Sequence, residues 1–108
     1  MVLSEAHAAG TRRAGIMKRL LVNADDWGMT DGVCRGILHA RAQGVVRSTT
    51  VMVCVPGVME RLTRHAADLR GWAGLHLQLT SGTPCLDPAQ VPTLVGPDGR
   101  FPARPEGL

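Results

Sequence analysis

The sequence predicts an α/β fold in which parallel strands alternate with helices. Short apolar or β-branched runs alternate with segments whose apolar residues recur every three or four positions, and glycine or proline separates them. This order is typical of successive βα units and disfavours a sheet built from hairpins. At 108 residues the chain is one small domain at most, and it is short for an α/β barrel, which typically needs roughly 200 residues or more.

The composition excludes two classes of partner. No apolar run approaches the roughly 20 residues that span a bilayer, so we expect no membrane span. The formal net charge is +3, but the basic residues form no stripe, and the aromatic content is only 3%. Without a basic face or base-stacking side chains, nucleic-acid binding is not expected.

The cysteines favour a reduced, cytoplasmic protein. They are odd in number, widely spaced and without a CxxC pair, so we interpret them as small hydrophobic residues. They are Cys34, Cys54 and Cys85. Residues 1–16 lack a continuous apolar run like that of a secretory signal. We expect these residues to be a disordered tail or an unused upstream start, and the domain to occupy residues 17–108.

The first βα unit follows from residues 19–43. The continuous apolar character of Leu20, Leu21 and Val22 predicts a strand over 19–24 that is buried on both faces. Thr30 is a good N-cap, apolar residues then recur at helical spacing, and Gly44 is a natural C-cap. The pattern therefore predicts a helix over 31–43.

The second unit and the third strand follow the same logic. β-branched residues predict a strand over 45–54. Pro56 suits a first helical turn, and the apolar spacing predicts a helix that ends before Gly71. A third strand is predicted over 73–79, with Leu75, Leu77 and Leu79 on one face and Gly74, His76 and Gln78 on the other. After Thr80 the chain is proline-rich and irregular, with a turn at 97–99.

Asp25 and Asp26 are the most informative residues, because apolar strands rarely end in two adjacent carboxylates. Burying one such charge is costly and two repel, unless a metal ion or a shared proton offsets the cost. His76 interrupts another short apolar strand. Active sites of parallel α/β folds lie at the carboxyl ends of strands, so we expect these three residues to converge there. Carboxylates with a histidine are typical of a divalent-metal hydrolytic centre.

Each of these residues also has an ordinary structural interpretation. One aspartate can cap the following helix while the other is solvated, and a lone histidine in an apolar strand can be a hydrogen-bonded core residue. The other histidines lie in the tail or in predicted helices and suit surface or packing roles; these are His7, His39 and His65. Ser48, Thr49 and Thr50 are interpreted as ordinary strand residues, with a hydroxyl inside a barrel as the alternative.

Several stretches in a fixed order resemble the N-terminal part of the YdjC-like carbohydrate deacetylases. The matching stretches are Leu21-Val22-Asn23-Ala24-Asp25-Asp26-Trp27-Gly28, Gly32-Val33-Cys34-Arg35-Gly36-Ile37, Arg47-Ser48-Thr49-Thr50-Val51-Met52-Val53, Gly74-Leu75-His76-Leu77-Gln78-Leu79-Thr80-Ser81-Gly82, Val91-Pro92-Thr93-Leu94-Val95 and Asp98-Gly99-Arg100-Phe101. They cover nearly all of residues 18–103. Trp27 departs from the family, which usually has Phe at this position.

The resemblance implies a partial (β/α) barrel of the glycoside hydrolase/deacetylase type, of which this chain is the N-terminal βαβαβ portion. It implies that Asp25 is the general base and that Asp26 and His76 hold a divalent cation, Mg²⁺ or Zn²⁺. The implied substrate is an acetylated amino sugar or oligosaccharide. Family members supply a second metal-binding histidine and a general-acid histidine from later segments. We therefore expect a truncated chain that is inactive alone and that is either marginally stable or homo-oligomeric. The alternative is a non-catalytic metal-binding, sugar-binding or assembly module.

Overall fold

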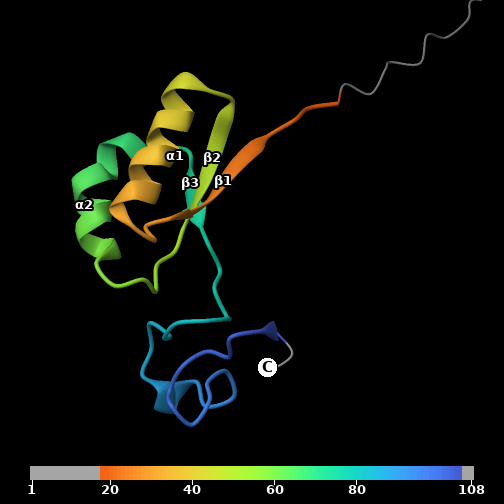
Figure 1. Cartoon of the computed structure of the whole chain (residues 1–108), viewed down its shortest axis with the longest axis vertical. Helices are drawn as coiled ribbons and strands as arrows, with labels where there is room; N and C mark the ends of the chain where they lie inside the picture. The colour runs from red at the N-terminus through yellow and green to blue at the C-terminus, as the bar shows by residue number, and fades with distance from the viewer. Residues whose placement is uncertain (1–17, 106–108) are drawn as a thin grey trace, which may run out of the picture.

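The computed structural model describes residues 18–105 and shows a small α/β unit followed by an irregular segment (Figure 1). The expected tail at 1–16 lies outside the described residues. Within them, three parallel strands form one sheet in the order β1-β2-β3, and both helices cover the same face of that sheet (Figure 1). In chain order the elements are β1 (Val22–Trp27), α1 (Asp31–Gln43), β2 (Val46–Val51), α2 (Val58–Leu69) and β3 (Ala73–Leu75).

Helix α1 confirms its predicted bounds because its ends are encoded locally. The Thr30 side chain accepts a hydrogen bond from the Val33 amide at 3.2 Å, and Gly44 is the C-cap. Cys34 and Ile37 face the sheet and are buried.

Helix α2 begins later than predicted. Pro56 does not lie in its first turn; Gly57 is the N-cap, with a φ of 76° in the left-handed region that glycine adopts without steric cost. The helix is kinked at His65, whose backbone is non-helical with a φ of −113° and a ψ of 16°.

The prediction for the first strand is wrong in position and in burial. Strand β1 starts at Val22, while Leu20 and Leu21 are 89% and 67% exposed. The ladder to β2 begins at the pair Val22 and Val46, so residues 18–21 pair with no strand in the described part of the chain. The strand instead continues to Trp27, with partly buried and exposed residues alternating along it.

The other two strands are shorter than predicted. Strand β2 ends at Val51 rather than at residue 54, because the chain turns toward α2 after the Met52 amide bonds to the Trp27 carbonyl at 2.9 Å. Strand β3 ends at Leu75 rather than at residue 79, since its ladder pairs only with Thr49–Val51. The apolar face predicted for the third strand is consequently solvated, and Leu75 and Leu77 are 61% and 74% exposed.

The core lies between the helices and one face of the sheet. Trp27 is completely buried at its centre, packed with Cys34, Ile37, Val51, Val58 and Leu69. Thr49 is also buried on this face, and its hydroxyl donates to the Ala24 carbonyl at 2.7 Å. Thr50, the next residue along β2, therefore faces the opposite side of the sheet.

The segment after Thr80 contains turns and one short 3₁₀ helix, Pro88–Gln90. The predicted turn at 97–99 is confirmed by a hydrogen bond of 2.9 Å from the Gly99 amide to the Gly96 carbonyl. The Ser81 amide bonds to the Pro102 carbonyl and the Phe101 amide to the Gly82 carbonyl, so the two ends of this segment lie side by side. Among the described residues, no helix is long and apolar enough to cross a membrane.

Candidate active site at the carboxyl end of the sheet

Asp25 and Asp26 lie in a bulge of β1. Ala24 pairs with Thr49 and Trp27 pairs with Val51, so β1 holds one residue more than β2 between these pairs. Ala24 and Trp27 both pack on the helix side, which regular alternation along a strand would not allow for residues three apart. The extra residue restores Trp27 to the core and leaves two consecutive carboxylates for the other face.

Asp26 carries the conformational cost of this bulge. Its φ is 66°, one of two positive values at non-glycine residues among the described part of the chain. Aspartate tolerates the left-handed region better than most residues, because its short side chain bonds locally. Strained backbone of this kind clusters where function requires an unusual side-chain direction.

Asp25 is held by two hydrogen bonds on one carboxylate oxygen. Its Oδ1 accepts from Asn23 Nδ2 at 2.7 Å and from Thr50 Oγ1 at 2.9 Å. Asn23 lies two residues earlier on the same face of β1, and Thr50 projects from the neighbouring strand. The two donors fix the carboxylate, and the described residues give Oδ2 no hydrogen-bond partner. An oriented carboxylate with one free oxygen suits proton abstraction.

His76 joins this group from the residue after β3. Its amide bonds to the Val51 carbonyl at 2.9 Å, which extends the strand pairing by one step and aims the ring at the bulge. Its Nδ1 lies 3.1 Å from Thr50 Oγ1 and 3.6 Å from Asp26 Oδ1. The structure thus brings together Asp25, Asp26 and His76 as expected from their positions at strand ends.

The donor set fits part of a divalent-cation site. Asp26 Oδ1 and the His76 ring lie side by side, and carboxylate oxygen with imidazole nitrogen suits zinc and related ions. Within residues 18–105 neither Asp25 nor Asp26 forms an ion pair with lysine or arginine, so the two adjacent negative charges favour a cation. No cluster of three or more histidine, cysteine or acidic residues arranged to hold a metal occurs in that range.

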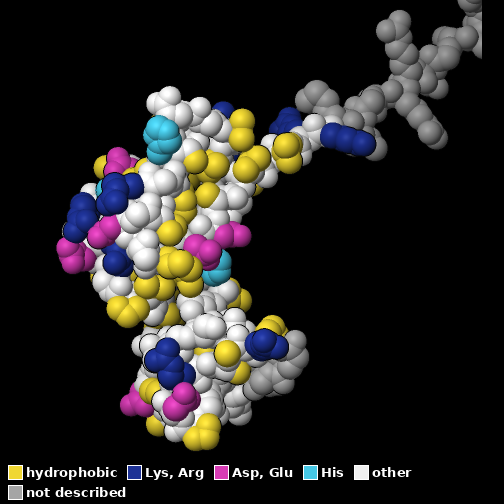
Figure 2. Space-filling view, viewed as in Figure 1, with side chains coloured by type: hydrophobic (Ala, Val, Ile, Leu, Met, Phe, Trp, Pro, Cys, Tyr) yellow, Lys and Arg dark blue, Asp and Glu magenta, His cyan; other side chains and the backbone are white. Residues whose placement is uncertain are grey.

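The site is open to solvent. The side chains of Asp26 and His76 are 43% and 26% exposed, and Asp25 is exposed. Figure 2 shows acidic side chains next to a histidine where the surface is hollowed between the sheet and the C-terminal segment. A large polar substrate can therefore approach these groups directly.

Arg61 ties together the loops that flank the site. Its Nη1 donates to the Gly28 carbonyl at 3.2 Å and to the Pro56 carbonyl at 2.9 Å, and its Nε contacts the Asp31 carboxylate at 3.1 Å. Gly28 itself has a φ of 100°, and a Cβ there would lie 2.9 Å from Val58 Cγ2. The loops after β1 and β2 are thus fixed to each other and to α2.

Sequence reasoning missed two residues of this group. The sequence pattern favours an ordinary strand role for Thr50, with a hydroxyl inside a barrel as the alternative, and it assigns no role to Asn23. The alternation of strand side chains was the available signal for Asn23, which shares a face with Asp25. Thr50 could not be assigned without the register between β1 and β2, which depends on the bulge.

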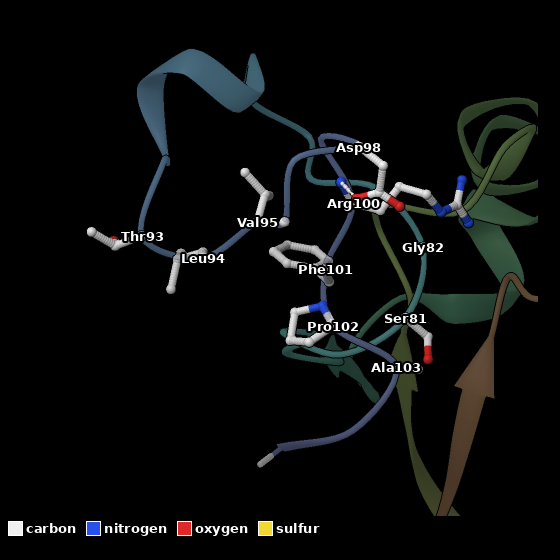
Figure 3. A pocket seen from close by; sticks show the side chains of 11 residues that line it. Ser81, Gly82, Thr93, Leu94, Val95, Asp98, Arg100, Phe101, Pro102 and Ala103 are labelled. Carbon is white, nitrogen blue, oxygen red and sulfur yellow. Dashed lines mark hydrogen bonds between the residues drawn. The ribbon is translucent and has the colours of Figure 1, made fainter. Parts of the chain in front are cut away.

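Two other features lie away from this group. Cys54 and Cys85 are not isolated small hydrophobic residues as expected; their sulfur atoms lie 2.6 Å apart, and the contact with Cys54 raises the pKa of the Cys85 thiol. A cavity of about 410 Å³ lies within the C-terminal segment, where the Phe101 ring points toward Val95 (Figure 3). Asp25, Asp26 and His76 do not line this cavity.

Comparisons with known proteins identify relatives of the chain. The sequence model of the family described as YdjC-like protein matches residues 19–107. A carbohydrate deacetylase from Vibrio vulnificus strain CMCP6 is 45% identical over 85 residues, which are 77% of this chain and 32% of the relative. A carbohydrate deacetylase from Geobacillus stearothermophilus is 43% identical over 90 residues, which are 82% of this chain and 35% of the relative.

One solved structure is also similar to this chain. The crystal structure of a protein described as a candidate cellobiose-phosphate cleavage protein from Enterococcus faecalis V583 superposes with a TM-score of 0.65 at 38% identity. The match covers 78% of this chain and 33% of that one. The chain therefore spans about a third of the length of these relatives. On the family match over residues 19–107, the chain belongs to the YdjC-like protein family.

Proposed function

We propose that the chain is the first part of a metal-dependent carbohydrate deacetylase, which removes N-acetyl groups from amino-sugar oligosaccharides by hydrolysis. The observation that carries this proposal is the convergence of Asp25, Asp26 and His76 at one end of the sheet. The names of the relatives from Vibrio vulnificus and Geobacillus stearothermophilus supply the substrate class. Parallel strands in sequence order with both helices on one face further support a (β/α) barrel, of which this unit is the beginning.

In this mechanism Asp25 is the general base. Asn23 and Thr50 hold its Oδ1, so Oδ2 accepts a proton from the water that attacks the acetyl carbonyl. Asp26 and His76 would hold the divalent cation, which polarises the amide carbonyl and lowers the pKa of water when bound. The acid that protonates the leaving amine comes from outside residues 18–105 in this proposal.

A chimera tests the assignment of Asp25. Residues 18–105 are joined to the remaining part of the Geobacillus stearothermophilus relative, and acetate release from N-acetylglucosamine oligomers is measured. We expect Asp25→Asn to lower kcat by about 10²–10⁴-fold, since the amide cannot take the proton. Asp68→Asn is the matched control, because Asp68 is an exposed carboxylate that bonds His65 on α2. A folded chimera that is equally active with Asn at position 25 contradicts the proposal.

Calorimetry with Zn²⁺ tests the metal ligands in the chain as it stands. We expect weak binding, because a catalytic zinc site usually has three protein ligands and only Asp26 and His76 are candidate ligands among residues 18–105. Asp26→Ala and His76→Ala should each abolish it. Tight binding that survives both substitutions together would show that other residues hold the ion.

A second candidate function is assembly through the sheet edge. Strand β3 is an edge of the described sheet, and Leu75 and Leu77 beside it are largely exposed. Edge strands with exposed apolar side chains favour association between copies. Sedimentation equilibrium should detect a dimer that the double variant Leu75→Ser, Leu77→Ser converts to monomer. A wild-type chain that is monomeric at high concentration argues against this function.

A further inference from the structure

Thr50 lies between the two ionisable groups of the site. Its single hydroxyl contacts Asp25 Oδ1 at 2.9 Å and His76 Nδ1 at 3.1 Å. Both distances are within normal hydrogen-bond range. The side chain is half-buried on β2, the central strand of the described sheet, so its position is fixed by pairing on both sides.

Counting protons determines the direction of both bonds. A hydroxyl carries one hydrogen, and an ionised carboxylate can only accept, so the hydrogen of Thr50 goes to Asp25. The contact with His76 is then a hydrogen bond only if Nδ1 carries a proton and donates to Thr50 Oγ1. Asp26 Oδ1 lies 3.6 Å from the same nitrogen, beyond hydrogen-bond distance.

We propose that Thr50 is a positioning residue that holds neutral His76 in the Nδ1–H tautomer and leaves the Nε2 lone pair free to bind a cation. Ligand histidines commonly donate their second ring nitrogen to an oxygen acceptor, which fixes both tautomer and ring direction. Here that acceptor is itself bonded to Asp25. Thr50 thereby couples the orientation of the cation-binding ring to the orientation of the carboxylate. That a cation binds at Nε2 rests on the proposed function, whereas the tautomer held by Thr50 does not.

Nitrogen-15 NMR of the histidine rings tests the tautomer directly. The spectrum is recorded on the full chain without metal, at a pH above the titration of imidazole. We expect an Nδ1–H pattern for His76, although free histidine favours Nε2–H. Thr50→Val should convert His76 to the Nε2–H pattern, and Thr50→Ser should retain Nδ1–H, because serine keeps the hydroxyl.

Two controls separate this role from a general effect on the fold. Thr49→Val alters the adjacent residue, whose hydroxyl bonds Ala24 on the helix side, and should leave the His76 pattern unchanged. His65, whose Nδ1 lies 3.0 Å from Asp68 Oδ2, is an internal reference in the same spectra. An Nε2–H pattern for His76 in the wild-type chain overturns the proposal even if Thr50→Val fails to fold. A pattern unchanged by a folded Thr50→Val overturns it as well.

Zn²⁺ alone provides a second readout. We expect Zn²⁺ to perturb Nε2 of His76 rather than Nδ1, and Thr50→Val to weaken binding by about 10–100-fold. Perturbation of Nδ1 would overturn the assignment of the free lone pair. Failure of the wild-type chain to bind Zn²⁺ at all would contradict the metal site of the proposed function, whereas the metal-free tautomer decides the role of Thr50.

Discussion

Deleting Asp26 should remove the candidate metal ligand without destabilising the fold. The bulge exists because β1 has one residue more than β2 between the pairs Ala24 with Thr49 and Trp27 with Val51. Without Asp26, regular alternation places Ala24 on the helix side, Asp25 on the other face and Trp27 back in the core. The deletion therefore straightens the ladder and keeps the buried tryptophan in place.

The magnitude follows from what the deletion removes. A non-glycine residue at a φ of 66° costs about 1–2 kcal/mol, although aspartate lowers that cost. The contact of Asp26 with His76 is partly exposed and contributes about 0–1 kcal/mol at most. We expect the free energy of unfolding to stay within about 1 kcal/mol of the wild-type value or to rise, while Zn²⁺ binding is lost.

Urea denaturation followed by tryptophan fluorescence measures this difference. Deletion of Thr50 is the matched control, because β2 is paired on both sides there and has no bulge between Thr49 and Val51. That deletion turns Val51 out of the core and should cost at least about 1.5–3 kcal/mol from its burial alone. If deleting Asp26 destabilises the chain as much as deleting Thr50, the fold requires the bulge for its stability and the reasoning is wrong.

Three further predictions concern other contacts. Thr49→Val should lower the free energy of unfolding by about 1 kcal/mol in urea, because the bond to the Ala24 carbonyl is lost, whereas Thr63→Val at an exposed site should change it little. Arg61→Lys should also destabilise the chain, by about 1–2 kcal/mol, since one ammonium cannot reproduce the three contacts of the guanidinium; the exposed Arg64→Lys is its control, and equal losses would contradict the role of Arg61. Cys54→Ala should speed alkylation of Cys85 by iodoacetamide at a pH below its thiol pKa, because the contact with Cys54 raises that pKa and so lowers the thiolate fraction. Mass spectrometry under reducing conditions measures the alkylation rate of Cys85, and a rate unchanged by the substitution would contradict this reasoning.

The sequence predicted the helices better than the strands, for a physical reason. The start of α1 is encoded by Thr30 and its end by Gly44, both within the segment itself. Strand ends depend on the partner strand, so the apolar residues Leu20 and Leu21 suggested pairing that β2 does not offer.

The candidate site likewise has a part that the sequence could predict and a part that depends on strand pairing. Asp25, Asp26 and His76 could be found from residue type and from their places at strand ends. The bulge could not be predicted, because it becomes visible only when β1 is aligned with β2. Without it, the contribution of Thr50 could not be derived, since its contacts join Asp25 on β1 to His76, the residue after β3.

The adjacent threonines on β2 separate the requirements of packing from those of the polar group. Thr49 serves the packed helix side, and Thr50 serves the solvated side that carries the polar group. Substitutions at alternate positions of this strand therefore have different consequences. Those on the Thr49 side affect folding, and those on the Thr50 side affect the chemistry of the polar group. The residues that pack between the helices and the sheet can therefore be changed together, by evolution or by design, while the residues on the opposite face of the sheet are kept.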